Sequence, residues 1–328
     1  MKKRLLIGGL VALLAVSDAA ANDTSFALAA GGMVFEKNDA VRMRSEVLRI
    51  AVDQVEVNYV FENISSEEVT LNVAFPLPPT AQTRAYPIYF DYPMPEPNFV
   101  NFRLWVDGEP LTPSLDVRVF SKEGADVTKI LNDLGVSLFD PFSRSFSKMP
   151  LAVREAMKKQ GLADHHENDD DWWLEGLITK VTFHWRQRFP VGQKIKVRHL
   201  YQPVSGSRPM SAKDGHLEEE KKFWCLDDAF LKVFTRWSRE SEAREPMGSG
   251  YLRAHDVGYV LQTGANWAGP IEDFTLIVQK SLKRKQLIST CPIPGLKLEK
   301  QGDAFVAKAK NFVPRSDLHL LFVDEDER

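Results

Sequence analysis

Apolar and polar residues alternate along much of the chain, and this pattern limits the fold more narrowly than any other feature. Residues 44–120 hold four sets with a spacing of two: Val55, Val57, Tyr59 and Phe61; Val69, Leu71, Val73 and Phe75; Phe102, Leu104 and Val106; and Leu115, Val117 and Val119. Such alternation is typical of strands with one buried and one solvated face, as in antiparallel sandwiches. We therefore expect a mainly β protein.

The second half of the chain alternates in the same way. We predict that the segment 181–185 pairs as a β-hairpin with the segment 195–201, across the turn-forming sequence Pro190-Val191-Gly192-Gln193. Further alternating sets predict more strands toward the C-terminus: Tyr259 and Leu261; Phe274, Leu276 and Val278; Phe305 and Ala307; and Leu318, Leu320 and Phe322.

Two stretches change to the period of a helix. Residues 124–162 are expected to form two short helices that end near Gly135 and Gly161. A third helix is expected near 228–244, with Asp227 or Asp228 as its N-cap. Its apolar face is Phe230, Val233, Phe234 and Trp237. The predicted fold class is mainly β (α+β): an antiparallel β-sandwich with an inserted helical pair and one further helix.

Residues 1–21 have the pattern of a secretory signal peptide. The basic start Lys2-Lys3-Arg4 is followed by an apolar run over residues 5–16 and by the small residues Ala19-Ala20-Ala21. The apolar run is too short to cross a bilayer as a helix, so a membrane anchor is the weaker alternative. We expect cleavage after Ala21 and a periplasmic or secreted chain with no membrane span.

The processed chain, residues 22–328, is expected to fold as a single β-rich domain, because no linker divides it clearly. Two abutting β lobes, 22–123 and 175–328, stay open as an alternative, with the helical insertion 124–162 between them.

The two cysteines have two interpretations. In an oxidising compartment, Cys225 and Cys291 most simply form one disulfide, which would close a loop of about 67 residues. A nucleophilic thiol would instead need a nearby base and an electropositive setting. Cys225 follows Phe223-Trp224 and precedes Leu226-Asp227-Asp228, and such apolar and acidic neighbours raise a thiol pKa. We predict the disulfide.

Composition and missing motifs argue against several functional classes. The 328 residues include 42 Lys+Arg and 45 Asp+Glu, and this balance gives no basic surface of the kind that nucleic-acid binding needs. Two cysteines are too few for a four-cysteine zinc site. The sequence has no phosphate-binding loop, no dinucleotide-binding glycine motif, no His-Glu-x-x-His and no Gly-x-Ser-x-Gly. We expect no cofactor, no resident metal and no nucleic-acid partner.

Aromatic residues form one candidate binding surface. The stretch 76–97 has seven prolines and the tyrosines Tyr86, Tyr89 and Tyr92, so we expect an extended loop and not a central strand. Trp172 and Trp173 follow an acidic loop, and paired tryptophans can stack on a sugar or a partner surface. The alternative is that these rings pack onto the protein's own core.

Histidines and carboxylates form a second group of candidates. The run His165-His166-Glu167-Asn168-Asp169-Asp170-Asp171 contains metal-ligand residue types, but a solvated acidic loop is the favoured interpretation. His184 and His199 lie on the two segments of the expected hairpin, with His199 on its apolar face. A buried structural histidine is favoured over a proton-handling pair.

Several motifs are similar in kind and order to those of an exported bacterial family: Gly31-Gly32-Met33-Val34-Phe35, Phe75-Pro76-Leu77-Pro78-Pro79, Trp105-Val106-Asp107-Gly108, His199-Leu200-Tyr201-Gln202-Pro203 and Trp224-Cys225-Leu226-Asp227-Asp228. Together they resemble the family named domain of unknown function 4424, over essentially the whole processed chain. The resemblance implies a secreted, mainly β protein with no assigned activity, and it carries over no catalytic residues.

Two functions follow as expectations. The first is a monomeric, non-enzymatic binding or interaction module of the cell envelope, with an envelope protein or a small ligand as partner. The second is an exported hydrolase that uses His165, Asp169 or His199. These two functions differ in whether at least two such groups converge in a concave pocket.

Overall fold

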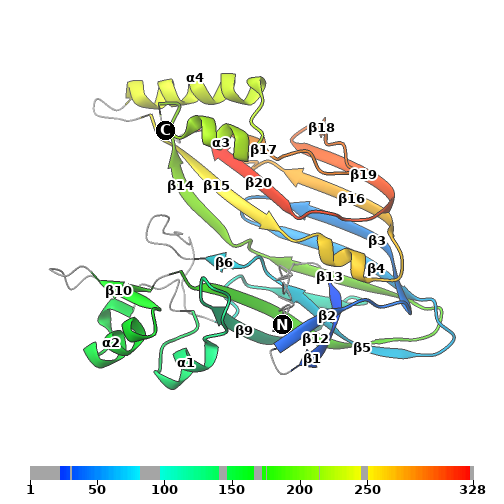
Figure 1. Cartoon of the computed structure of the whole chain (residues 1–328). Coiled ribbons are helices and arrows are strands. Elements are labelled where there is room, and N and C mark those ends of the chain that lie inside the picture. Colours follow the sequence, from blue (N-terminus) through cyan, green and yellow to red (C-terminus); the bar gives the residue numbers. More distant parts are fainter. Residues whose placement is uncertain are drawn as a thin grey trace, which may run out of the picture.

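Two large β-sheets face each other in the computed structural model (Figure 1). The structure describes residues 23–29, 32–81, 97–139, 146–165, 172–174, 176–213, 215–244 and 250–325. The first sheet has six strands in the order β2-β1-β5-β12-β6, and β9 also pairs with β12. These strands are β1 (Thr24–Ala29), β2 (Gly32–Glu36), β5 (Val69–Pro76), β6 (Thr80–Ala81), β9 (Ser114–Phe120) and β12 (Ile178–Phe189).

The second sheet has eight strands in the order β18-β19-β16-β3-β4-β13-β7-β8. Their bounds are β3 (Val41–Ile50), β4 (Val55–Asn63), β7 (Arg103–Val106), β8 (Glu109–Leu111), β13 (Lys194–Tyr201), β16 (Ile271–Gln279), β18 (Glu299–Gln301) and β19 (Ala304–Phe312). All pairs are antiparallel except β3 and β16, which are parallel. Each large sheet therefore contains strands from both halves of the chain.

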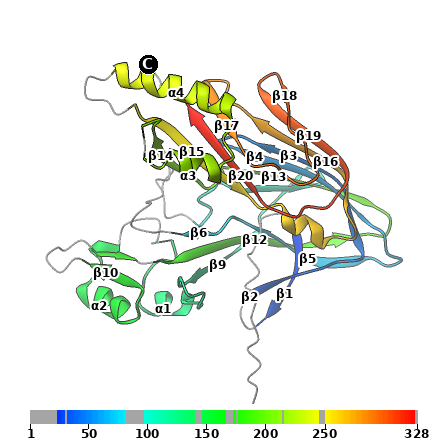
Figure 2. The ribbon, with the colours of Figure 1, turned by 45° about the horizontal axis from the view of Figure 1, so that its top comes forward.

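A third sheet of four strands has the order β14-β15-β20-β17 and is covered by helices. It comprises β14 (Ser205–Met210), β15 (Leu252–Tyr259), β17 (Gln286–Ser289) and β20 (Leu318–Asp324). Helices α3 (Leu217–Phe223) and α4 (Asp228–Arg244) accompany it, and Figure 2 shows α4 on the outside of these strands. The short 3-10 helix η3 (Gln262–Asn266) follows β15.

The inserted helices lie at the other end of the first sheet from β1 and β2 (Figures 1 and 2). They are α1 (Thr128–Asp133) and α2 (Leu151–Lys159), with the 3-10 turn η2 (Phe146–Lys148) and the ribbon of β10 (Ala163–His165) and β11 (Trp172–Leu174). Their apolar side chains form a small core of their own, which includes Leu131, Met157 and Trp172. No helix in the part of the chain that the structure describes is long and apolar enough to cross a membrane.

The main core lies between the two large sheets. The first sheet contributes Phe75, Phe183 and Trp185, among others, and the second contributes Tyr59 and Val197. Strand β20 serves two cores, because Leu320 and Phe322 point into the sandwich while Leu321 and Val323 meet helix α4. The predicted class, a β-rich sandwich with an inserted helical pair and a further helix, is confirmed.

The expected hairpin of segments 181–185 and 195–201 is wrong. Strand β12 pairs with β5, β6 and β9, whereas β13 pairs with β4 and β7 in the other sheet. The chain crosses from one sheet to the other at residues 190–193, so the two strands face each other across the core. Alternation shows which face of a strand is buried, and that face is the same in a hairpin and in such an arch.

The expected helix ends are confirmed. Gly135 and Gly161 both have positive φ, as residues that end a helix in the left-handed conformation do. Helix α4 has the predicted bounds, and its N-cap is Asp227, whose carboxylate accepts the N–H of Phe230 at 2.7 Å. Helix α3 was not expected, because its seven residues bury none of their side chains and give no apolar period.

A glycine secures the return of the chain from α4 to β15. Gly250 has a φ of +67°, and its carbonyl accepts the hydroxyl of Ser238 at 2.7 Å. A Cβ at this position would lie 2.5 Å from the Ser238 carbonyl oxygen. The chain therefore passes so close to the helix that a side chain does not fit.

We expect Gly250→Ala to lower the free energy of unfolding by about 3 kcal/mol, since it adds a steric clash to a left-handed φ. Gly302→Ala is the matched control, because Gly302 has a φ of +60° and nothing within 4 Å of the added Cβ. The control measures the loss of unfolding free energy that comes from the left-handed φ alone, about 1 kcal/mol. Urea denaturation of both variants measures the difference, and equal losses would contradict the clash.

Candidate functional site

Six polar side chains lie deep between the sheets, and we call them the interior cluster. They are Asp23, Glu46, Tyr59, His199, Tyr201 and Tyr259, and none is more than 2% exposed. Groups of this kind are costly to bury, so a concentration of them inside an apolar core calls for a physical explanation.

Strand register brings Glu46 and His199 onto the inner face of the eight-stranded sheet. Glu46 pairs with Tyr59 on β4, and Tyr59 pairs with Val197 on β13. Residues directly opposite in a sheet share a face, and residues two apart along a strand also share it. His199 is two residues from Val197, so it lies in the next inward row.

A β-bulge turns Glu46 inward. The register of β3 against β4 shifts between Met43 and Ser45. Before the shift the buried residues have odd numbers, such as Val41 and Met43, and after it they have even numbers, such as Leu48. A bulge inserts one extra residue and so exchanges the two faces of the strand. Without this bulge, Glu46 would point to solvent.

His199 is enclosed by aromatic rings. Its ring lies 4.7 Å from Phe75, 5.0 Å from Phe102 and 5.5 Å from Trp185, between ring centroids. Its Nε2 atom is 3.5 Å from Oδ1 of Asp23. Neither ring nitrogen has a hydrogen bond to a described residue. Burial lowers the pKa of His199 to about 3, so the imidazole is neutral at physiological pH.

Burial raises the pKa values of four members of the cluster. Burial raises the pKa of Asp23, and the nearby charge of Glu46 raises it further. Burial also raises the pKa of Tyr59 and of Tyr259, whose hydroxyl groups lie 3.1 Å apart, and the charges of Asp23 and Glu46 add to both shifts. The pKa of Tyr201 is raised by burial. The neutral, protonated forms of Asp23 and of the three tyrosines are therefore favoured inside the sandwich.

The backbone at Asp23 is fixed. The indole Nε1–H of the buried Trp267 donates to the carbonyl oxygen of Asp23 at 2.6 Å. The side-chain amide of Asn266 donates to the hydroxyl of Thr24 at 3.0 Å. Because Asn266 is the last residue of η3 and Trp267 follows it, this part of the chain ties the start of β1 into the interior.

The interior cluster is closed to solvent, so a substrate cannot reach it in this conformation. Among the described residues, no group of three His, Cys, Asp or Glu side chains is placed to hold a metal ion.

A cleft beside the disulfide is the second candidate site. Its volume is about 340 Å³. It is lined by Phe223, Trp224, Thr290, Cys291, Pro292, Ile293, Ser316, Asp317 and His319. The predicted disulfide is confirmed, with the Cα atoms of Cys225 and Cys291 5.0 Å apart. The bond joins the α3–α4 connection to the segment after β17, and so fixes two walls of the cleft.

The cleft combines an exposed ring with polar groups. Phe223 is 67% exposed and stands edge-on to the buried Trp224, at 4.9 Å between ring centroids. The carbonyl of Trp224 accepts the hydroxyl of Ser289 at 2.9 Å. The carboxylate of Asp317 accepts the backbone N–H of Leu261 at 3.0 Å, which holds the opposite wall.

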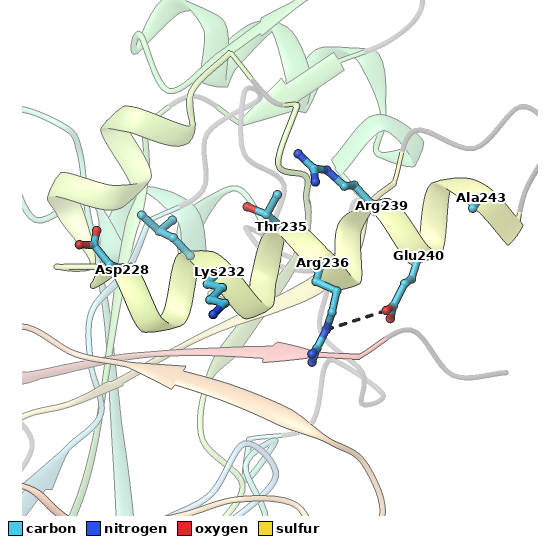
Figure 3. A pocket seen from close by; sticks show the side chains of 8 residues that line it. Asp228, Lys232, Thr235, Arg236, Arg239, Glu240 and Ala243 are labelled. Carbon is cyan, nitrogen blue, oxygen red and sulfur yellow. Dashed lines mark ion pairs between the residues drawn. The ribbon is translucent and has the colours of Figure 1, made fainter.

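The outward face of helix α4 bounds a third, shallower hollow of about 580 Å³ (Figure 3). Those of its lining residues that the structure describes all belong to this helix, and their charges are mixed. Arg236 and Glu240 form an exposed ion pair at 3.8 Å. These features are typical of a solvated helix face, so the cleft beside the disulfide is the stronger candidate for binding.

A family model described as "Domain of unknown function (DUF4424)" matches residues 21–321. The chain belongs to this family. None of the curated proteins matches it. The family membership agrees with the motifs of the sequence, and the DUF4424 description assigns no activity.

Several solved structures show a distant likeness to this DUF4424 chain. One from Legionella pneumophila subsp. pneumophila, described as a "putative nutrient binding protein", is 15% identical over 92% of this chain and 70% of that chain, with a TM-score of 0.42. A yeast LTA4 hydrolase is 6% identical over 86% of this chain and 28% of that chain, with a TM-score of 0.30. The M1 zinc metallopeptidase of Deinococcus radiodurans is 8% identical over 88% of this chain and 43% of that chain, with a TM-score of 0.28. TM-scores below 0.5 support no conclusion about what this chain binds.

The residues expected to bind or react lie in separate places. Trp172 is buried in the small core of the DUF4424 chain and stacks on His165 at 4.2 Å, whereas Trp173 is half-buried. His165 is on β10, while His199 is enclosed between the large sheets, so the structure does not bring them together in one pocket. Tyr86, Tyr89, Tyr92 and Asp169 lie outside the described residues.

Sequence reasoning missed Glu46 and Phe223. The change from odd to even apolar positions within 41–50 was a usable signal for Glu46, because it requires a bulge. Phe223 had no comparable signal, because its exposure depends on how α3 sits against distant segments.

Proposed function

We propose that this chain is an exported protein, cleaved after Ala21, that binds a small ligand without catalysis in the cleft beside the disulfide. The disulfide is compatible with a secreted protein, because such bonds persist in oxidising compartments. The leader pattern of residues 1–21 supports the same location.

The exposed Phe223 carries the proposal. A large aromatic ring that is 67% exposed at the edge of a cleft is a usual anchor for a ligand with an apolar face. Thr290, Ser316 and His319 add hydrogen-bonding groups on the other walls. A compact polar molecule with one apolar face, such as a sugar or a short peptide, matches this lining.

The disulfide supports the proposal in a second way. Since it links the two segments that carry Phe223 and Pro292, it holds the cleft open in a fixed shape before a ligand arrives. A preformed site loses less entropy on binding than one that must be ordered.

The aromatic surface expected at Tyr86, Tyr89, Tyr92 and Trp173 remains a proposal for contact with an envelope protein. Trp172 contributes its ring to the small core, so Trp173 is the member of the pair with exposed area. We propose that the protein is a monomer whose ligand cleft acts independently of this surface.

A panel of sugars and short peptides, screened by intrinsic tryptophan fluorescence, to which Trp224 contributes, and by melting temperature, tests the cleft. We expect one class to bind, and Phe223→Ala to weaken its affinity by about tenfold or more, the effect of losing an apolar ring contact. The matched control is Leu282→Ala, which removes an 85% exposed apolar side chain that does not line the cleft.

Equal affinity of the Phe223→Ala and Leu282→Ala variants would place the ligand elsewhere. Turnover of a bound compound, seen as a change in its mass, would contradict the non-enzymatic part of the proposal.

A further inference from the structure

The charge of the cleft beside the disulfide has one sign. Among the described residues that line it, Asp317 is the one carboxylate, and none is a lysine or an arginine. Arg315 is close to Asp317 in the sequence, but it is exposed and does not line the cleft. Apart from His319, whose imidazole can take up a proton in acid, the charge that the cleft offers a ligand is therefore negative.

The backbone holds the carboxylate of Asp317 in place. Its Oδ1 atom accepts the N–H of Leu261 at 3.0 Å and the N–H of Gln262 at 3.2 Å. A carboxylate has two oxygen atoms with about four acceptor positions in total. Because both backbone bonds use Oδ1, they fix the group and leave acceptor positions for a ligand.

The exposed ring of Phe223 provides the second element of a cation site. The face of an aromatic ring carries partial negative charge, and it attracts an ammonium group within about 6 Å of the ring centroid. Phe223 and Asp317 both line one cleft of about 340 Å³, which is small enough for a single compact ligand to contact both. A carboxylate and an aromatic face on the walls of one cleft favour an ammonium group over a neutral or an acidic one.

We propose that the ligand of this cleft is a small amine, whose ammonium group binds the carboxylate of Asp317 while its apolar part lies on Phe223. The inference rests on the proposed function and names the chemical class of its ligand. An amino sugar and the free amino end of a short peptide both have such a group, whereas neutral sugars and acylated peptides lack it.

Two probes of the same shape test the preference for charge. In 2-phenylethylamine and 2-phenylethanol, an ammonium group and a hydroxyl group occupy the same position beside an identical ring. We expect the exported protein to bind the amine about fivefold or more tightly than the alcohol at pH 7, measured by saturation-transfer NMR titration. The acid 3-phenylpropionate should bind more weakly than either. Raising the salt from about 0.05 M to about 0.5 M should reduce the advantage of the amine, because salt screens the charge of Asp317.

Asp317→Asn removes the charge and keeps a side-chain carbonyl oxygen for the N–H groups of Leu261 and Gln262. We expect this variant to bind the amine about fivefold more weakly and to bind the alcohol as the wild type does. The matched control is Asp53→Asn, which removes an exposed carboxylate that does not line the cleft, and it should bind both probes unchanged. The salt and acid comparisons need only the wild type, so they decide the question even if Asp317→Asn does not fold.

A second pair of probes, glucosamine and glucose, separates the two sources of the amine. A larger gain for glucosamine over glucose would indicate an amino sugar, and a larger gain for 2-phenylethylamine over its alcohol would indicate an amine with an aromatic or other apolar side group. If neither amine binds more tightly than its alcohol, the ammonium site is refuted.

Phe223→Ala and Leu282→Ala separate this inference from the proposed function. If Phe223→Ala alone weakens the binding of the alcohol, while the amine has no advantage in the wild type, the cleft stands and the ammonium site fails. If neither Phe223→Ala nor Asp317→Asn changes the binding of any probe, the cleft is not the binding site and both proposals fail.

Discussion

Acidification from pH 6.5 to pH 3 should destabilise the wild type more than a His199→Leu variant, with the difference growing by about 1.4 kcal/mol per pH unit. Below pH 6.5 the unfolded chain binds a proton at His199, whereas the folded chain binds it only near pH 3. Stability is therefore lost as the pH falls through this window, to a total of about 4 to 5 kcal/mol.

The other titrating groups around His199 act differently. Asp23 has a raised pKa, so its folded form takes up a proton first and gains stability as the pH falls. Tyr59, Tyr201 and Tyr259 have raised pKa values and stay protonated in acid. Glu46 is common to both proteins, so comparing the variant with the wild type cancels its main contribution.

Urea denaturation at half-unit pH intervals measures this difference. His216→Leu removes a histidine whose side chain is 73% exposed, and its curve sets the baseline for losing an imidazole from the surface. A constant difference between wild type and His199→Leu across the window would mean that His199 becomes protonated in the folded state. A glutamine at 199 serves as a second variant if leucine perturbs packing.

The local signals in the sequence predicted the elements well and their neighbours poorly. The apolar face of α4 and its Asp227 cap depend only on residues that are close together in the sequence. A periodic pattern is therefore sufficient to find them. Whether β12 pairs with β13 depends on the conformation of residues 190–193. There the chain can either turn back within one sheet or cross to the facing sheet. Both routes bury the same side chains, so periodicity does not distinguish them.

The candidate sites were harder to predict for a related reason. The cleft joins residues near 223, 291 and 317. The disulfide brings the first two together, but nothing in the sequence places residue 317 beside them. The inward direction of Glu46 depends on one bulge, and the buried position of Asp23 depends on a hydrogen bond from Trp267. The change from odd to even apolar positions in 41–50 marks the bulge, whereas the other long-range contacts leave no pattern in a single sequence.

Loss of the disulfide should be the second large effect. Replacing Cys225 and Cys291 together by alanine is expected to lower the free energy of unfolding by about 4 kcal/mol, because the bond closes a long loop in the unfolded chain. The melting temperature should fall by about 10 °C. Calorimetry of the oxidised wild type and the double variant measures both, and adding reductant to the double variant should change nothing further.

The same variant should also lose the cleft, because Cys225 has a left-handed φ of +52°. A residue other than glycine adopts that conformation at a cost of about 1 to 2 kcal/mol, so it persists where the surroundings hold it. Without the bond we expect the backbone at residue 225 to relax, Phe223 to move, and the intrinsic tryptophan fluorescence, to which Trp224 contributes, to change below the melting transition. Unchanged fluorescence and ligand affinity in a folded double variant would show that packing alone shapes the cleft.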